Sequence, residues 1–152
     1  MKRVKMQIEV LPNYRVAYIR RVGAYGAANY QTMEQLKKWA AEKDLLTGTS
    51  IILGISHDDP TATPPEQCRY DAAIVVADNP EKDTSVDAGV TRGGKYACFL
   101  VEHTTAAIQQ AWSTIAEELL QHGLEPDNRP IAERYREELV SRHYCEICIP
   151  IK

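Results

Sequence analysis

The last strand of the chain is predicted in the stretch His143-Tyr144-Cys145-Glu146-Ile147-Cys148-Ile149-Pro150-Ile151. Successive residues of a strand point to opposite faces, so Glu146 lies on the face opposite an apolar one. A carboxylate in such a strand is either exposed to solvent beside an arginine or lies in a cavity, where its charge has a functional role. The expected apolar face is formed by Cys145, Ile147, Ile149 and Ile151.

The composition is that of an ordinary globular protein. A chain of 152 residues is long enough for one compact domain or for two small fused halves. Apolar residues make up 44% and charged residues 26%, and the net charge of −3 offers no basic surface for nucleic acid. No signal-like or membrane-length apolar run is present. We therefore expect a cytoplasmic protein that binds neither DNA nor a membrane directly.

The cysteines and histidines do not have the spacing of a metal site. Cys145 and Cys148 form a C-x-x-C pair, but on a strand this spacing sends the two thiols to opposite faces. The sequence has no second C-x-x-C motif to complete a four-ligand site, and the four histidines are scattered along the chain. We expect no metal and no cofactor, with free thiols at Cys68, Cys98, Cys145 and Cys148.

The first half of the chain alternates between strand and helix patterns. Two strands at 4–11 and 14–22 flank Pro12-Asn13, and we expect them to form a hairpin. An amphipathic helix is predicted over 27–43. Further on the sequence predicts a strand over 50–56, a proline-rich loop over 57–67 and a strand over 69–77.

The second half repeats this order after a polar linker at 78–87. A helix begins at Thr104 or Thr105, which are good N-caps, and ends at His122 before Gly123. Residues 131–139 fit either a helix or a strand. Before the helix the sequence predicts a strand over 86–90, a tight turn at Gly93-Gly94 and a strand over 95–103.

The sequence therefore predicts an α+β fold in which a strand-strand-helix-strand-strand unit occurs twice within one domain, at about 1–80 and 84–152. We expect a mostly antiparallel sheet, two long helices packed on it and a central cleft. Asp71 and Glu146 occupy matching places in the two halves. The helix residues expected against the sheet are Met33, Leu36 and Ala40 in the first half and Ile108, Ala111, Ile115 and Leu119 in the second.

Several motifs resemble the GyrI-like, or bacterial effector-binding, family over essentially the whole chain. They are Asp58-Asp59-Pro60 with Thr63-Pro64-Pro65-Glu66, Arg69-Tyr70-Asp71, Gly93-Gly94-Lys95-Tyr96-Ala97, Trp112 and the terminal Glu146-Ile147-Cys148-Ile149-Pro150-Ile151. The resemblance implies the duplicated fold and small-molecule binding. Its members include drug-sensing domains of AraC-type and MerR-type regulators, gyrase inhibitors, and stand-alone binders, some with hydrolase activity. One departure is that 130–135 lacks the F-E-V-Y strand usual there.

The resemblance also implies a binding site. In the family, the acidic residue that matches Glu146 lies at the base of a hydrophobic pocket, and aromatic residues comparable to Trp112 line it. An unpaired carboxylate withdrawn from water attracts a cation, and aromatic walls add cation–π attraction. An unpaired buried carboxylate also destabilises the protein without its ligand, so we expect Glu146→Gln to leave the fold intact or to stabilise it. The candidate ligand-binding residues are Glu146, Trp112, Tyr144, Tyr18, Phe99 and Asp71, although Tyr18 and Phe99 also suit a core.

Three functions are compatible with these features. The favoured one is a stand-alone protein that binds a hydrophobic small molecule of cationic or aromatic character. The alternative is a hydrolase of electrophilic small molecules in which Glu146 is the general base. A third possibility is an interaction protein that inhibits DNA gyrase through its surface. The sequence begins directly with strand residues, so no helix-turn-helix is expected to precede the domain.

Overall fold

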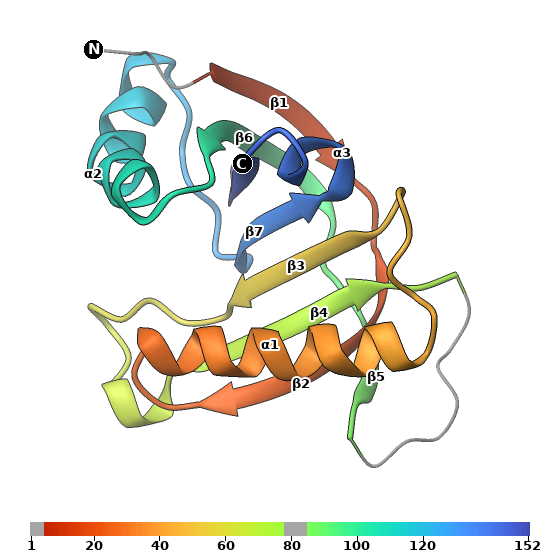
Figure 1. Ribbon diagram of the computed structural model, residues 1–152. Coiled ribbons are helices and arrows are strands. Elements are labelled where there is room, and N and C mark those ends of the chain that lie inside the picture. Colours follow the sequence, from red (N-terminus) through yellow and green to blue (C-terminus); the bar gives the residue numbers. More distant parts are fainter. Residues whose placement is uncertain (1–4, 78–84) are drawn as a thin grey trace.

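A computed structural model describes residues 5–77 and 85–152 of the chain (Figure 1). Eight strands form one antiparallel sheet in the order β1-β6-β8-β7-β3-β4-β2-β5, and the fold is α+β as expected. The strands are β1 (Lys5–Leu11), β2 (Arg15–Val22), β3 (Ile51–Ser56), β4 (Arg69–Val75), β5 (Asp87–Val90), β6 (Gly94–Glu102), β7 (Ile131–Arg136) and β8 (Tyr144–Pro150). The helices are α1 (Ala27–Glu42), α2 (Thr105–Gln121), the single turn α3 (Glu137–Val140) and a 3-10 turn at Pro65–Gln67.

The strand order confirms the duplication. Strands β1, β2, β3 and β4 correspond to β5, β6, β7 and β8. Exchanging each strand with its counterpart gives the same sheet order read from the other edge. The two halves meet where β3 pairs with β7, so the sheet has a pseudo-twofold axis at its centre. The expected boundary between the repeats, at 80–84, lies outside the described residues.

The expected hairpin between the first two strands is wrong. Strand β1 pairs with β6, whereas β2 pairs with β4 and β5, so the chain crosses between the two halves at 12–14. The second half crosses back at 91–93, where a tight turn was expected. The reason lies in the cores: Met6 of β1 packs against the apolar cluster beneath α2 and not against that beneath α1. A short polar link between two strands serves a hairpin or a crossover equally well.

The two crossovers lie against each other. The backbone N–H of Tyr14 donates to the Thr91 hydroxyl at 2.8 Å, and the N–H of Thr91 donates to the Tyr14 carbonyl at 2.8 Å. The N–H of Gly93 donates to the side-chain oxygen of Asn13 at 2.7 Å. Three residues span roughly 10 Å at most, yet each crossover joins strands that lie far apart in the sheet order. The sheet is therefore strongly curved and closes toward itself at this end.

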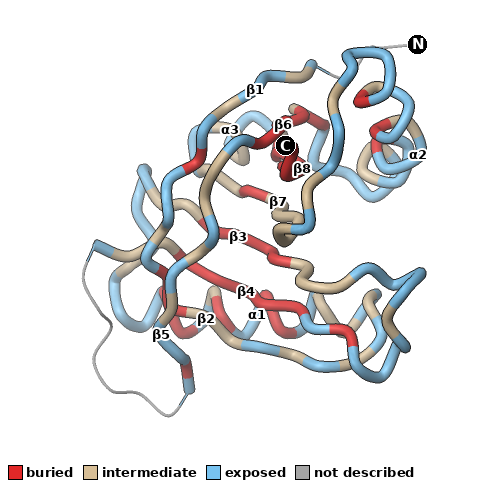
Figure 2. Tube along the Cα trace, turned by 180° about the vertical axis from the view of Figure 1, so that it is seen from behind, coloured by how far each residue is buried: buried red, intermediate tan, exposed pale blue. Residues whose placement is uncertain are grey.

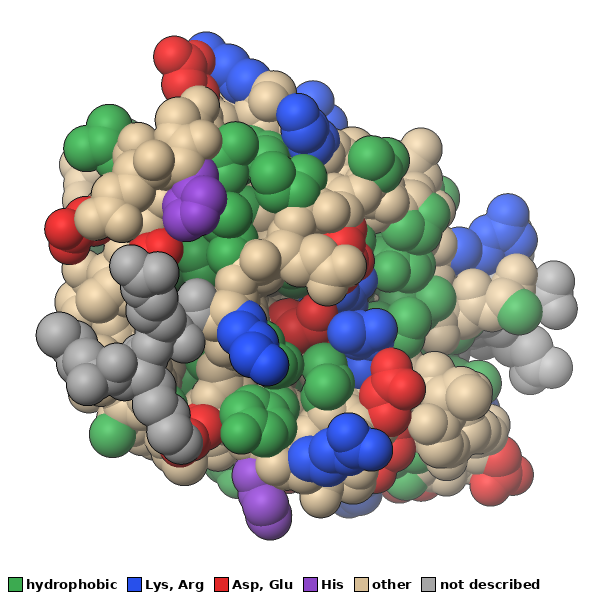
Figure 3. All heavy atoms as spheres, turned by 90° about the horizontal axis from the view of Figure 1, so that it is seen from above, with side chains coloured by type: hydrophobic (Ala, Val, Ile, Leu, Met, Phe, Trp, Pro, Cys, Tyr) green, Lys and Arg blue, Asp and Glu red, His purple; other side chains and the backbone are tan. Residues whose placement is uncertain are grey.

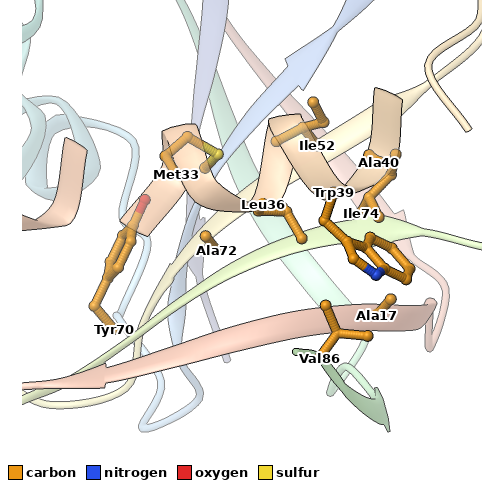
Figure 4. Close-up of a cluster of buried hydrophobic side chains, with 10 residues drawn as sticks. All are labelled: Ala17, Met33, Leu36, Trp39, Ala40, Ile52, Tyr70, Ala72, Ile74 and Val86. Carbon is orange, nitrogen blue, oxygen red and sulfur yellow. The ribbon is translucent and has the colours of Figure 1, made fainter. Parts of the chain in front are cut away.

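Each half has a core between its helix and the outer face of the sheet. Figure 1 shows α1 lying across β3, β4 and β2, and Figure 4 shows the side chains that it buries there. In the tube of Figure 2 the buried residues concentrate on the central strands, while the outer sides of both helices are exposed. The expected helix contacts are confirmed, with Met33, Leu36 and Ala40 in one cluster, and Ala111, Ile115 and Leu119 in the other with Ile108 packed against it.

The ambiguous segment before the last strand combines both structures that its sequence allowed. Residues 131–136 form β7, which pairs with β3 on one side and β8 on the other, and residues 137–140 form the turn α3. The missing F-E-V-Y pattern thus does not remove the strand. It changes which side chains the strand presents to the inner face of the sheet.

The packing of the two crossovers can be tested at Gly93. A Cβ atom built there would lie 2.3 Å from the carbonyl oxygen of Leu11, which is backbone and cannot rotate away. We expect Gly93→Ala to lower the free energy of unfolding by about 1–3 kcal/mol, the usual range for overpacking. Chemical denaturation measures this. Gly48→Ala is the control, because its Cβ meets no atom within 4 Å, and equal losses in the two variants would contradict the close approach.

Candidate functional site

An open pocket of about 340 Å³ lies on the inner face of the curved sheet, the face turned away from the helices. Its floor is apolar and comes from three strands: Val16 of β2, Leu53 and Ile55 of β3, and Ala132 of β7. The two crossovers form one wall, through Tyr14 on one side and Thr91 and Arg92 on the other. Because strand residues alternate, Ala17 and Ile52, the chain neighbours of Val16 and Leu53, point to the core beneath α1.

The polar end of the pocket is built around Asp71. Its carboxylate accepts two hydrogen bonds from the guanidinium of Arg20, at 2.8 and 3.0 Å, and lies 2.6 Å from Nε2 of His57. Burial raises the pKa of Asp71, but the hydrogen bonds from His57 and Arg20 outweigh it and hold the pKa below its ordinary value. Arg20 also lies over the ring of Tyr18, at 5.4 Å from the ring centroid. Asp71 is thus a carboxylate whose charge is already balanced.

Glu146, the counterpart of Asp71 in the other half, does not line the pocket. Its carboxylate accepts hydrogen bonds from Arg134 at 3.0 and 2.8 Å and from Arg136 at 2.8 Å. Burial alone would lower the pKa of Arg134, but the bonds to Glu146 outweigh it and raise the pKa, so the guanidinium remains charged. Arg134 is 3% exposed and also pairs with Glu9 at 3.1 Å.

The expectation of an unpaired carboxylate in a cavity is therefore wrong for Glu146. Strand β7 places Arg134 directly opposite Glu146 in the sheet register, where the two side chains share one face. Tyr14 lies between this ion pair and the pocket lining in its contacts: it lines the pocket, and its hydroxyl lies 3.5 Å from Nη1 of Arg134. Figure 3 shows the molecule from above. Acidic and basic side chains lie next to one another in the middle of this face, with hydrophobic side chains around them.

The other candidate residues are not brought together. Tyr18 and Asp71 line the pocket. Phe99 is fully buried on the outer face of β6 beneath α2, because odd-numbered residues of that strand point to the helix. Trp112 is 39% exposed and lies outside the buried cluster of α2. Tyr144 is half-buried at the start of β8 and does not line the pocket.

Sequence reasoning missed the residues that shape the pocket most. His57 was assigned to a surface loop, and Arg20 was noted only as part of a strand, although its spacing from Val16 and Tyr18 puts all three on one face. Arg92 lies in a crossover that was expected to be a tight turn. The alternation along 15–22 was the one signal that could have found Arg20.

Comparison with known proteins gives the family. The model of the GyrI-like small molecule binding domain matches residues 5–152. The chain belongs to the GyrI-like family. Among its relatives, the Bacillus subtilis (strain 168) protein named "SPbeta prophage-derived putative transcriptional regulator YosT" is 41% identical over 150 residues, which cover 98% of this chain and 100% of that protein. DNA gyrase inhibitor 2 of Dickeya dadantii (strain 3937) is 24% identical over 133 residues, covering 86% and 83% of the two chains.

Solved structures agree with this GyrI-like fold. The C-terminal domain of EcmrR superimposes with a TM-score of 0.73 at 11% identity, over 98% of both chains. SAV2435 bound to tetraphenylphosphonium superimposes with a TM-score of 0.63 at 18% identity, over 97% of this chain and 94% of that one. At these identities the likeness shows the fold alone.

The four cysteines of the GyrI-like domain are free thiols. Cys145 points to the core beneath α2, whereas Cys148 faces the inner side of the sheet beside Cys98, so the expected opposite placement of the C-x-x-C pair is confirmed. Burial raises the pKa of Cys145 to about 12. Within 5–77 and 85–152, no cluster of His, Cys, Asp and Glu could hold a metal ion, and no helix is long and apolar enough to cross a membrane.

The ion pair of Glu146 reverses the expected effect of its substitution. In Glu146→Gln the guanidinium of Arg134 loses its buried carboxylate and keeps only the partly exposed one of Glu9, so we expect a loss of unfolding free energy near the lower end of the about 3–5 kcal/mol for a broken buried pair. Removing both charges in Arg134→Met with Glu146→Leu avoids the unpaired charge, and we expect this double variant to be close to wild type in stability. Urea denaturation of the three proteins measures the difference. A Glu146→Gln protein as stable as wild type would contradict the pairing.

Proposed function

We propose that this GyrI-like domain binds a hydrophobic aromatic small molecule in the pocket beside Asp71, which residues of both halves line, and not against Glu146. The observation that carries this proposal is the open apolar floor of Val16, Leu53, Ile55 and Ala132. Buried sheet faces are normally covered by another layer, whereas this one borders open space. An apolar ligand that fills the space gains mainly by removing its own surface from water, because Val16, Leu53 and Ile55 are already buried.

The dimensions and walls of the pocket suit a fused-ring compound. Its volume of about 340 Å³ lies near the lower end of the range for small-molecule sites, roughly 300–1,000 Å³. Tyr14, Tyr18 and Tyr96 line it and offer ring faces or edges to an aromatic ligand. The Tyr96 hydroxyl donates to the carbonyls of Arg92 and Pro130, at 2.9 and 3.3 Å, so this ring is fixed before a ligand arrives. A rigid wall lowers the entropy that binding costs.

The geometry of the pocket favours an aromatic ligand over a cationic one. The expectation of a cation rested on an unpaired Glu146, and that carboxylate is bound by two arginines. Asp71 is the acidic side chain among the described residues that line the pocket, and both of its oxygens are occupied by Arg20 and His57. A cation in this pocket would therefore have to displace an existing partner. The tetraphenylphosphonium in SAV2435 is a property of that protein.

The same contacts weigh against a hydrolase that uses Glu146. A general base needs a lone pair within hydrogen-bond reach of a water or substrate. Glu146 is 5% exposed and accepts three hydrogen bonds from charged donors, which occupy its oxygens. Inhibition of DNA gyrase would act through the outer surface, and the 24% identical gyrase inhibitor is what supports that second possibility.

The pocket can be tested by filling it. N-phenyl-1-naphthylamine is a neutral probe with a naphthalene and a phenyl ring, and its fluorescence rises in apolar surroundings. We expect it to bind wild type, and to raise the free energy of unfolding by about 2.7 kcal/mol at a hundredfold excess over Kd. Ala132→Phe places a ring in the pocket floor and should weaken binding by at least about tenfold, or roughly 1.4 kcal/mol.

A matched substitution elsewhere gives the control for this experiment. Ala116→Phe adds the same ring on the exposed side of α2, away from the pocket, and should leave the affinity unchanged. Fluorescence titration of the three proteins compares the dissociation constants. Failure of the wild type to bind the probe, or equal affinities of wild type and Ala132→Phe, would contradict the proposal.

A further inference from the structure

The side chains that line the pocket carry more positive than negative charge. The described lining includes three arginines and one histidine but a single carboxylate, that of Asp71. Net charge over the whole chain has the opposite sign, at −3, so the excess of cations is a local property of the pocket. The basic groups are Arg20, His57, Arg69 and Arg92.

Two of the three arginines are neutralised by carboxylates within the protein. Arg20 is bound by Asp71, as described above. Arg69 donates from Nε and Nη2 to the two oxygens of Asp58, at 3.0 and 3.0 Å, in a bidentate pair. Both pairs have the fork geometry in which a guanidinium is best satisfied by a carboxylate. Neither arginine therefore needs a ligand to balance its charge.

Arg92 differs from these two. It is exposed at the rim of the pocket, and within residues 5–77 and 85–152 no carboxylate forms an ion pair with it. Its backbone is nevertheless held in place. The Arg92 carbonyl accepts the hydroxyl of Tyr96 at 2.9 Å, and its neighbours Thr91 and Gly93 are bonded to the other crossover. A charged side chain is thus presented from a fixed backbone beside the apolar floor.

We infer that the ligand of this pocket is an amphipathic anion, an aromatic ring system that carries a carboxylate or sulfonate group. The ring lies on the floor formed by Leu53 and Ala132, and the acidic group pairs with the guanidinium of Arg92. This inference rests on the proposed function, because it concerns the same pocket. It differs from the expectation drawn from the sequence, which was a cation held by Glu146.

Physical chemistry favours this sign of charge. Arginine presents planar donors that match the two oxygens of a carboxylate or sulfonate, and the apolar floor beside it weakens competition from water. A cationic ligand of equal size would meet an uncompensated guanidinium at the rim and no free carboxylate among the described lining residues. Like charges brought together in this way disfavour the wrong partner. The pocket should therefore discriminate between ligands by charge as well as by shape.

Three aromatic probes that differ in charge separate the possibilities. N-phenyl-1-naphthylamine is neutral, 1-anilinonaphthalene-8-sulfonate has the same rings with a sulfonate, and tetraphenylphosphonium is a cation. At low ionic strength we expect wild type to bind the sulfonate about tenfold more tightly than the neutral probe, and the cation most weakly. Ala132→Phe should weaken both naphthalene probes, which places them in the same pocket.

Variants of arginine then test the contact itself. Arg92→Gln should weaken the sulfonate far more than the neutral probe and so remove most of the preference for the sulfonate, while Arg92→Lys should keep part of that preference. Arg142→Gln is the control, because it removes the same charge from an exposed arginine that does not line the pocket, and it should change neither affinity.

The outcomes distinguish this inference from the proposal on which it rests. If the neutral probe binds and Ala132→Phe weakens it, but Arg92→Gln does not alter the sulfonate affinity, the pocket is real and the anionic ligand is wrong. Tighter binding of tetraphenylphosphonium than of the sulfonate would also overturn the inference. If neither naphthalene probe responds to Ala132→Phe, both the inference and the proposed function fail.

Discussion

Two connections of only three residues each constrain the whole structure. At 12–14 and 91–93 the chain passes between halves of the sheet, and the short length forces strands that are distant in sheet order to approach at this end. Arg129 fixes the second connection to the last strand, because its guanidinium donates to the carbonyls of Gly93, Lys95 and Ile151. The resulting curvature gives the sheet an inner face, and the crossovers themselves become the wall of the pocket.

The two equivalent carboxylates differ in how far their arginine partners are exposed. Asp71 is paired with an arginine whose side chain is 37% exposed, and that pair lines the pocket. Glu146 is paired with Arg134, whose side chain is only 3% exposed. A buried ion pair of this kind is tolerated only when both charges are well paired. The proposed ligand lies on the other side, where Arg20 remains partly at the surface.

Sequence patterns predicted much of this fold because the relevant signals are local. The apolar stripe of each long helix and the alternation along strands such as 144–150 follow from the geometry of single elements, and the resemblance to a known family agreed with them. The exchange of β1 and β5 between halves is not a local property, since Pro12-Asn13 permits a hairpin as readily as a crossover. The sequence did not indicate the partner of Glu146 for a similar reason. Arg134 lies 12 positions earlier in the chain and becomes its neighbour only through the register of β7 and β8.

The position of the ligand is the central claim, and a crystal structure of the domain with N-phenyl-1-naphthylamine tests it most directly. We expect the naphthalene ring against Leu53 and Ala132, beside Tyr14, with the bonds between Arg134 and Glu146 unchanged. The contrary result would be a ligand in contact with the carboxylate of Glu146 and an Arg134 side chain displaced from it. That result would place the site in the second half of the sheet.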